Sequence, residues 1–225
     1  MSHQTFKAIF ISDLHIGAKD VKLDKLFKFI KEVKTQKIFL VGDIIYRNCK
    51  RDNRDLEEFI SLLKAKDCEL IFLWGNHESQ RDKMPYVLES IEFHNSYIYK
   101  IGDKKVYINH GDSYDSKDSF LRSLKYVAKR TQVKVKDKKS KANLKRKLHR
   151  FLKEIAKVLL HNNFAKYMAL KAKKNRCDIV ICGHFHIAKN KKNYGIEYFN
   201  CGDWISNHSY VAHNQNDTLT LHHYN

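Results

Sequence analysis

The sequence of 225 residues has one proline, eight glycines and five cysteines, and each shortage excludes a class of protein. So little proline and glycine excludes collagen-like and low-complexity chains. The cysteines are odd in number and have no Cys-x-x-Cys spacing, which favours a reducing compartment over a disulfide framework. The sequence has neither a secretory signal pattern nor an apolar run of the roughly 20 residues that span a bilayer. We therefore expect a cytoplasmic protein.

Apolar side chains are plentiful. Hydrophobic residues make up 43% of the chain and aromatic residues 12%, which is enough to bury a core and excludes a wholly disordered protein. The length suits one large domain, or one domain that carries an insertion. We therefore predict a single domain over residues 1–225.

The positive charge is concentrated in one segment. Residues 117–176 contain 21 Lys and Arg but only 3 Asp and Glu, so they carry the whole formal net charge of +18. We predict that residues 113–176 form a basic helical cap inserted into the domain, because so long an insertion usually covers a site. Its charge favours an anionic partner, which can be a phosphate, a nucleic acid or lipid headgroups. The alternative is a solvated basic surface.

One part of this segment has the pattern of a basic amphipathic helix. Leu144, Leu148, Leu152, Ile155 and Leu159 fall on one helical face, and Lys and Arg occupy much of the remainder. Two interpretations stand side by side. The helix packs its apolar stripe on the body of the protein as a lid, or it lies on an anionic membrane surface, at the inner face of the membrane.

The rest of the chain alternates between strand-like and helix-like segments. The expected strands cover residues 7–12, 37–41, 69–74 and 178–182, and the expected helices cover residues 21–34 and 56–65. A hairpin is expected over residues 97–101 and 105–109, and short stretches such as 195–200 and 218–222 predict a closing antiparallel sheet. This order predicts a layered α/β domain with mixed sheets.

Acids, amides and histidines follow five of these strands. They are Asp13 and His15, Asp43, Asn76 with His77 and Glu78, His110 with Asp112, and His184 with His186. Because ligands bind at the carboxyl ends of strands in open α/β sheets, we expect these side chains to gather. Carboxylate, amide and imidazole ligands suit Mn, Fe or Zn better than Mg or Ca. The pattern predicts two divalent ions, with Asp43 as a candidate bridge, that bind a phosphoryl group and lower the pKa of water.

At these residues the chain resembles the calcineurin-like metallophosphoesterase superfamily. The matching motifs are Asp13-x-His15, Gly42-Asp43, Gly75-Asn76-His77-Glu78, Asn109-His110-Gly111-Asp112 and Gly183-His184-x-His186. The resemblance implies a four-layer sandwich, in which helices flank two mixed β-sheets, and a dinuclear metal centre.

The resemblance also implies roles for these residues. One metal would be held by Asp13, His15, Asp43 and His186. The second metal would be held by Asp43, Asn76, His110 and His184. The implied catalytic residues are Asp43 and His77, and His77 would stabilise the phosphoryl group or protonate the leaving oxygen, steered by Glu78. Manganese is the expected metal, with iron or zinc as alternatives.

A narrower likeness is to the branch that contains the UDP-2,3-diacylglucosamine pyrophosphatases of lipid A synthesis. It rests on residues 12–17, on His110-Gly111-Asp112 before a long helical insertion, and on residues 198–204. The likeness implies hydrolysis of an acylated nucleotide sugar to UMP and a lipid sugar phosphate under a helical cap. That branch often has Arg where this chain has His77. The departure concerns the precise substrate and not the hydrolytic chemistry.

Two other functions stay open. A metal-dependent phosphodiesterase or nuclease would use the basic segment to bind a nucleic-acid backbone, and its affinity would fall steeply with salt. A non-catalytic scaffold would bind a partner through the cap. Every ligand that the resemblance implies is present in the sequence, which counts against the scaffold.

Overall fold

The computed structural model describes residues 5–78, 84–114 and 160–225. The chain divides into two compact units. The larger unit consists of Met1–Asp112 and Met168–Asn225, and the smaller unit is Ser113–Tyr167.

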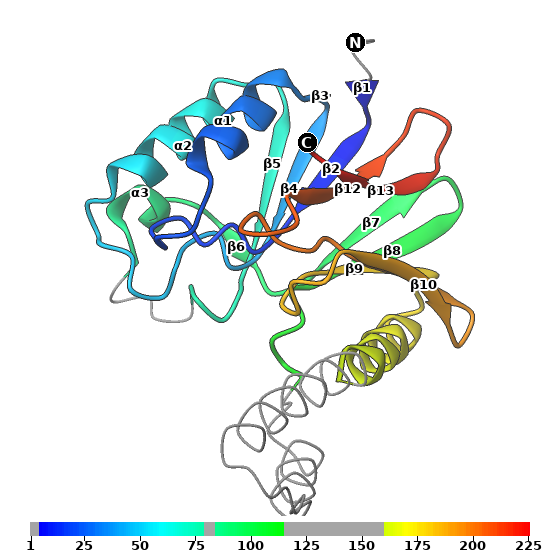
Figure 1. Ribbon diagram of the computed structural model, residues 1–225. Helices are drawn as coiled ribbons and strands as arrows, with labels where there is room; N and C mark the ends of the chain where they lie inside the picture. Colours follow the sequence, from blue (N-terminus) through cyan, green and yellow to red (C-terminus); the bar gives the residue numbers. More distant parts are fainter. Residues whose placement is uncertain (1–4, 79–83, 115–159) are drawn as a thin grey trace, which may run out of the picture. The chain divides into compact units, whose positions relative to one another are not determined.

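The larger unit contains a six-stranded mixed sheet (Figure 1). Its order is β13 (Leu219–His223), β12 (Ser209–His213), β2 (Ala8–Ile11), β4 (Lys37–Val41), β5 (Glu69–Leu73) and β6 (Phe93–His94). The strands β2, β4, β5 and β6 are parallel, whereas β12 joins β2 and β13 in antiparallel pairs. The carboxyl ends of β2, β4 and β5 therefore meet at one edge of the sheet.

A five-stranded mixed sheet forms the second layer. Its order is β10 (Lys189–Asn193), β11 (Ile196–Asn200), β9 (Ile179–Cys182), β8 (Lys104–Ile108) and β7 (Tyr97–Ile101). The three central strands are parallel, and β7 and β10 flank them in antiparallel pairs. A separate two-stranded parallel sheet joins β1 (Thr5–Phe6) to β3 (Lys34–Thr35).

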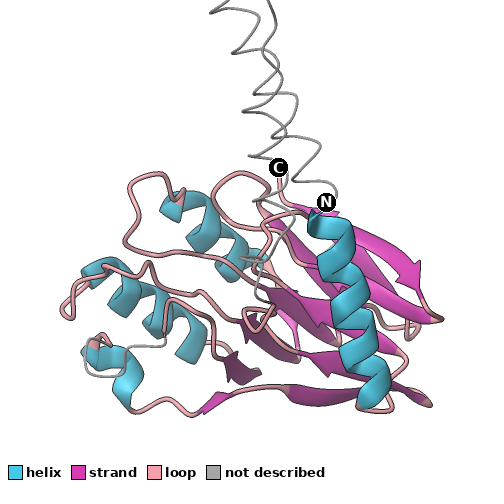
Figure 2. Cartoon of the chain, turned by 90° about the horizontal axis from the view of Figure 1, so that it is seen from below, coloured by secondary structure: helices cyan, strands magenta, loops and turns pink. Residues whose placement is uncertain are grey.

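Helices α1 (Leu23–Glu32), α2 (Arg54–Lys64) and α3 (Tyr86–Glu89) cover the outer face of the six-stranded sheet (Figures 1 and 2). The side chain of Asn53 starts α2 by accepting a hydrogen bond from the N–H of Leu56 at 2.9 Å. The buried sides of α1 and α2 pack on the residues of β2 and β4 that point outward.

The inner faces of the two sheets pack on each other. In β2, Ile9 and Ile11 face the helices, whereas Ala8 and Phe10 belong to the cluster between the sheets. This alternation follows from the two-residue period of a strand that is buried on both faces. Phe10 stacks on Phe39 of β4 with ring centroids 4.7 Å apart.

A helix covers the described residues 160–174, and the boundary between the two units falls within it. Its residues 168–174 belong to the larger unit, where Met168, Ala169 and Ala172 are buried, and in Figure 2 they lie over the five-stranded sheet. The larger unit is therefore an α/β sandwich of two mixed sheets flanked by helices, and the predicted fold class is confirmed. No helix among the residues that the structure describes is long and apolar enough to cross a membrane.

The smaller unit is described at its two ends only. The ring of Tyr114 packs on Phe164 at 5.5 Å and on Tyr167 at 5.2 Å between centroids, and Ser113 Oγ lies 3.2 Å from the Tyr167 hydroxyl. Most of the predicted cap, 113–176, lies outside the described residues, as does the predicted amphipathic helix up to residue 159. The cap and its membrane contact therefore stay predictions.

The strand and helix predictions agree with the structure except in the C-terminal part. The stretches 195–200 and 218–222 do not form one closing sheet: β11 lies in the five-stranded sheet, and β13 lies in the six-stranded one. Moreover, β11 pairs in parallel with β9, which its alternating sequence did not reveal. The partner of β13 is β12, which the sequence pattern missed.

Candidate metal centre

The predicted site residues follow the carboxyl ends of five strands in both sheets. Asp13 and His15 follow β2, Asp43 follows β4, Asn76 and His77 follow β5, His110 follows β8, and His184 and His186 follow β9. Contacts between these side chains bring them into one cluster.

The two carboxylate oxygens of Asp13 have different surroundings. Its side chain is fully buried, and its Oδ2 accepts hydrogen bonds from the Ser12 hydroxyl at 2.6 Å and from the backbone N–H of His184 at 2.9 Å. Its Oδ1 accepts no hydrogen bond from the described residues and lies 3.2 Å from His186 Nε2 and 3.8 Å from His15 Nε2. Burial raises the pKa of Asp13 because a lone charge is poorly solvated there. A cation beside Oδ1 would compensate for that cost.

Asp43 has the same arrangement. Its Oδ1 accepts the backbone N–H of His77 at 2.8 Å, and its Oδ2 lies 3.4 Å from His110 Nε2 and 3.8 Å from His77 Nε2. Burial acts to raise the pKa of Asp43, but the two imidazoles and the backbone hydrogen bond together hold it below its usual range. Asp43 groups with His15 on one side and with His110 and His184 on the other, which suits a bridging ligand.

His15 and His186 face each other beside Asp13. Their Nε2 atoms are 3.3 Å apart. Nδ1 of His186 lies 3.2 Å from Asp203 Oδ2, so the ring donates to this carboxylate and leaves Nε2 to face the cluster. Burial acts to raise the pKa of Asp203, but hydrogen bonds from His186 and from the backbone lower it to about 2. Burial lowers the pKa of His15 to about 4, so this ring is neutral at pH 7, as a ligand must be.

His110 and His184 form the other side of the cluster. The fully buried His110 donates from Nδ1 to the carbonyl oxygen of Val41 at 2.8 Å, which leaves Nε2 toward Asp43. Burial acts to lower the pKa of His110, but Asp43 outweighs it and raises the pKa to about 10. This place therefore favours a positive charge. His184 Nδ1 lies 3.0 Å from Asn76 Oδ1, which adds the predicted amide oxygen.

The backbone of the site is strained. Nine non-glycine residues in the described part of the chain have positive φ, and five of them are predicted ligands, with φ from 49° to 69°: Asp13, His15, Asp43, His184 and His186. Each such conformation costs about 1–3 kcal/mol and persists where the surroundings enforce it. Backbone hydrogen bonds between the loops do so, from the Asp13 N–H to Gly42 O and from the His15 N–H to Asp43 O, both at 3.1 Å.

Glycine is required at two points of this cluster. A Cβ on Gly183 would lie 1.8 Å from Ser12 Oγ and 2.4 Å from Asp13 Oδ2. Gly42 has φ of +80°, and a Cβ there would lie 2.7 Å from the ring of His110. These glycines allow the strand ends to approach closely enough for the ligands to converge.

The residues present fit divalent metal ions. Asp13 Oδ1 and His110 Nε2 are buried polar atoms that have no hydrogen-bond partner among the described residues, and such atoms are costly unless something satisfies them. Ligand atoms within 4.8 Å of one another form three groups: Asp13, His15 and His186; His15, Asp43 and His77; and Asp43, His110 and His184. All seven predicted ligand residues come together, while their binding of metal stays a prediction.

His77 lies beside this cluster, and Glu78 has a different role from the predicted one. His77 Nδ1 accepts the backbone N–H of Arg47 at 2.9 Å. Glu78 does not hold the His77 ring: its carboxylate accepts the N–H groups of Asp43, Ile45 and Gly75 at 2.9–3.1 Å. The prediction that Glu78 steers His77 is therefore wrong. The reason is that the fully buried carboxylate turns inward and ties the ends of β4 and β5 together.

Two supporting residues were not assigned from the sequence. Ser12 orients the carboxylate of Asp13, and Asp203 orients the ring of His186. Asp203 lies 17 positions from its histidine, so no local spacing reveals the pair.

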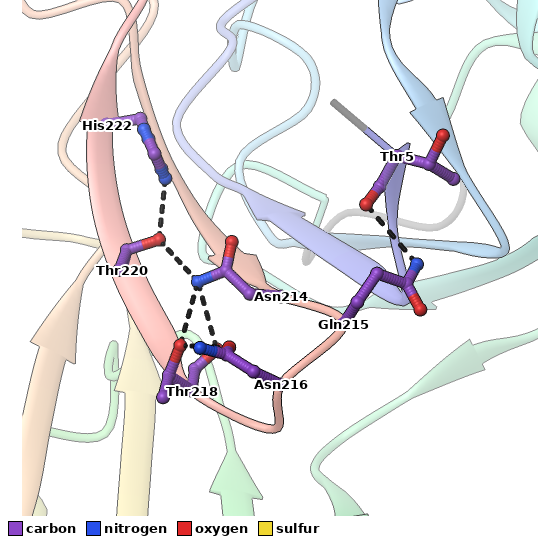
Figure 3. A pocket seen from close by; sticks show the side chains of 7 residues that line it. All are labelled: Thr5, Asn214, Gln215, Asn216, Thr218, Thr220 and His222. Atoms are coloured by element: carbon purple, nitrogen blue, oxygen red, sulfur yellow. Dashed lines mark hydrogen bonds between the residues drawn. The ribbon is translucent and has the colours of Figure 1, made fainter. Parts of the chain in front are cut away.

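One surface hollow lies away from this cluster. It has a volume of about 640 Å³, and Figure 3 shows its lining of polar side chains around the turn between β12 and β13, opposite Thr5. The side chain of Asn214 bonds Thr218 and Thr220 there, at 3.1 and 3.0 Å between Nδ2 and Oγ1. None of the predicted site residues lines it.

Comparisons with known proteins agree with this geometry. The sequence pattern of the calcineurin-like phosphoesterase family matches residues 6–188. A comparison with curated proteins gives no match.

Solved structures share the fold at low identity. They include Vps29 from Chaetomium thermophilum (10% identity, 96% of this chain and 94% of that one, TM-score 0.52) and an archaeal phosphodiesterase (14% identity, 96% and 98%, TM-score 0.50). The phosphoesterase YfcE from E. coli is similar as well (10% identity, 97% and 99%, TM-score 0.50). At such low sequence identity, these structures show that the fold is shared and nothing more. The family, in contrast, is shown by the sequence pattern, which matches most of the chain. The chain therefore belongs to the calcineurin-like phosphoesterase family and is a metal-dependent hydrolase of phosphoric esters.

Proposed function

We propose that the protein hydrolyses phosphodiester or pyrophosphate bonds with two divalent cations, and that manganese is the metal. Asp13, His15, Asp43 and His186 would hold one cation. Asp43, Asn76, His110 and His184 would hold the other. The proposal rests mainly on Asp13 and Asp43, whose carboxylates have the same surroundings. In each, one oxygen accepts a hydrogen bond from a backbone N–H and the other oxygen lies close to imidazole nitrogens.

The protein prepares this site for a phosphoryl group. When bound, a pair of divalent cations supplies Lewis acidity toward the phosphoryl oxygens and lowers the pKa of water. The side chains keep the ligand atoms in place before the cations bind, since backbone groups, Ser12 and Asp203 fix the orientation of the carboxylates and rings.

His77 is proposed to stabilise the phosphoryl group by donating a hydrogen bond. Because its Nδ1 accepts the N–H of Arg47, the neutral ring carries its proton on Nε2, which lies 3.8 Å from Asp43 Oδ2. Burial lowers the pKa of His77 and outweighs the opposing charge of Asp43, and the positive charge of Arg47 adds to the lowering, so the neutral ring is favoured. An N–H at this place can donate a hydrogen bond to a phosphoryl oxygen or to the oxygen of the leaving group and so stabilise the charge that develops there.

The finer choice of substrate is also part of the proposal. The likeness to the UDP-2,3-diacylglucosamine pyrophosphatases supports an acylated nucleotide sugar, whose pyrophosphate the cluster would accept. The acyl chains would need the cap, 113–176, most of which lies outside the described residues. A phosphodiesterase or nuclease uses the same cluster, so both substrates belong in the test.

The test is hydrolysis with added Mn²⁺ of three substrates: bis-p-nitrophenyl phosphate, UDP-2,3-diacylglucosamine and single-stranded DNA. Asp43→Asn should lower kcat about a hundredfold or more, because metal ions contribute several kcal/mol and each 1.4 kcal/mol is a factor of ten. Asp24→Asn, in the first turn of α1, is the matched control and should leave the rate unchanged.

The substrate that the protein hydrolyses distinguishes a nuclease from a nucleotide-sugar pyrophosphatase. A nuclease would cleave DNA with a steep loss of affinity as salt rises, whereas a nucleotide-sugar pyrophosphatase would release UMP. The proposal fails if the metal-loaded protein cleaves none of the three, or if Asp43→Asn cleaves as fast as the wild type.

A further inference from the structure

Tyr46 stands on a rigid backbone next to the metal cluster. Its N–H donates to the carbonyl oxygen of Ile16 at 2.9 Å, and its own carbonyl oxygen accepts the N–H of Cys49 at 2.8 Å. The preceding residue, Ile45, forms a parallel β-bridge with Ile16. The loop after β4 is thereby joined to the loop after β2, so the position of the Tyr46 backbone is fixed by the same contacts that position the ligands.

The ring of Tyr46 lies against His77. The two ring centroids are 5.7 Å apart at 60°, and the ring of His77 in turn lies 4.5 Å from that of His15. Three rings therefore run outward from the cluster, and the last of them, Tyr46, is 40% exposed. Single exposed aromatic residues are common and need no explanation by themselves. What distinguishes Tyr46 is its contact with His77, the proposed hydrogen-bond donor to the phosphoryl group.

Other exposed aromatic residues in the described part of the chain have different surroundings. Tyr86, at 60% exposure, has the guanidinium of Arg51 over its ring at 4.4 Å. Tyr194, at 56% exposure, lies in the turn between β10 and β11. Tyr46 is followed by the exposed Arg47, whose N–H holds the His77 ring. The pair 46–47 thus brings an aromatic face and a cation to the edge of the cluster.

We propose that Tyr46 is the stacking surface for a planar aromatic group next to the scissile phosphate, so that the enzyme prefers nucleotide substrates. This inference rests on the proposed function. In a nucleotide, one sugar separates the phosphate from the planar base. A phosphate among the ligands and beside His77 therefore places the base near the next ring outward. Stacking of a base on an aromatic side chain strengthens binding by about tenfold or more, and it tolerates any base because every base has a π-face.

The experiment compares ligands that differ only in the base. The probes are the methylene-phosphonate analogues of AMP, of UMP and of ribose 5-phosphate, which cannot be hydrolysed at the ester position. Their Kd values are measured calorimetrically on the Mn²⁺-loaded full chain. The wild type should bind both nucleotide analogues about tenfold more tightly than the ribose analogue, and Tyr46→Ala should reduce this ratio to near one. Tyr46→Phe keeps the ring and should keep the ratio, and so should Tyr194→Ala, the matched exposed tyrosine.

The outcomes separate this inference from the proposed function. Equal binding of the ribose and nucleotide analogues by the wild type overturns the stacking role, and so does a Tyr46→Ala variant that weakens all three analogues alike. If Tyr46→Ala does not fold by circular dichroism, Tyr46→Leu, which keeps the apolar bulk without the ring, replaces it with the same expectation. Failure of the proposed function would show separately, as no hydrolysis of bis-p-nitrophenyl phosphate by the wild type.

Discussion

At the scale of single residues, four side chains of the site each have one polar atom that is already hydrogen-bonded within the protein. Asp13 and Asp43 each have one oxygen fixed by a backbone N–H, and His110 and His186 each have Nδ1 fixed by an oxygen. Each side chain is therefore left with one oriented atom toward the cluster. Such outer partners raise the basicity of metal ligands and reduce the cost of ordering them, so they should contribute to affinity without touching the metal.

Asp203 offers the clearest test of this point. Asp203→Asn keeps an oxygen for the three backbone N–H groups of residues 205–207 but replaces the carboxylate beside His186. We expect Mn²⁺ affinity, measured by titration calorimetry, to fall about 10- to 100-fold while the far-UV spectrum stays unchanged.

The matched control is Asp217→Asn. Asp217 also faces a histidine, with Oδ1 2.9 Å from Nε2 of His213, but neither residue belongs to a metal-ligand group. Its substitution should leave the Mn²⁺ affinity as in the wild type. Equal affinities of the Asp203 and Asp217 variants would contradict the role of Asp203.

At the scale of elements, a buried histidine joins the two sheets. His213 of β12 lies in the six-stranded sheet, and its Nδ1 is 2.9 Å from the hydroxyl of Tyr99 in β7 of the five-stranded sheet. Its Nε2 lies 2.9 Å from Asp217, which also pairs with Lys7 at 2.6 Å. Burial lowers the pKa of His213, and Lys7 adds to this effect, although Asp217 opposes both.

The lowered pKa makes stability depend on pH. Because the folded pKa lies below the unfolded value of about 6.5, the unfolded chain takes up the proton first as the pH falls. The stability that neutral His213 contributes is therefore complete above that pH and is lost below it. We expect the Tm of the wild type to fall by a few degrees more between pH 7.5 and pH 5 than that of His213→Gln. Other histidines affect both proteins equally, so a gap in Tm that does not change with pH would contradict this prediction.

The elements also show what the sequence could predict. Apolar runs followed by Asp, Asn or His predicted β2, β4, β5, β8 and β9 and the residues at their ends, because each run and its end are local in the sequence. Other features depend on contacts between segments that are far apart in the sequence. Examples are the position of β11 between β9 and β10, and the contact of Tyr46 with His77. The direction of the Glu78 carboxylate was missed for the same reason, since its three partners belong to the ends of two strands. Local periodicity carries no information on such contacts.

At the scale of the whole larger unit, the candidate site joins both sheets. Asp13 and Asp43 follow strands of the six-stranded sheet, whereas His110, His184 and His186 follow strands of the five-stranded sheet. A cation held by these residues would cross-link the two layers. The unfolded chain has no such assembled site, so binding should stabilise the folded state.

This cross-link predicts a large thermal effect. A metal concentration about a thousandfold above Kd adds roughly 4 kcal/mol to the free energy of unfolding, and for a chain of this length each kcal/mol raises Tm by about 2–4 °C. We therefore expect saturating Mn²⁺ to raise Tm, measured by calorimetry, by roughly 10 °C, and EDTA to reverse the rise. Asp43→Asn should show no rise, because Asp43 belongs to both of the proposed cation sites, whereas the Tm of Asp24→Asn should rise like that of the wild type. The prediction is contradicted if Mn²⁺ does not change the Tm of the wild type, or if it raises the Tm of Asp43→Asn as much as that of the wild type. Either result would mean that metal does not join the two sheets at this cluster.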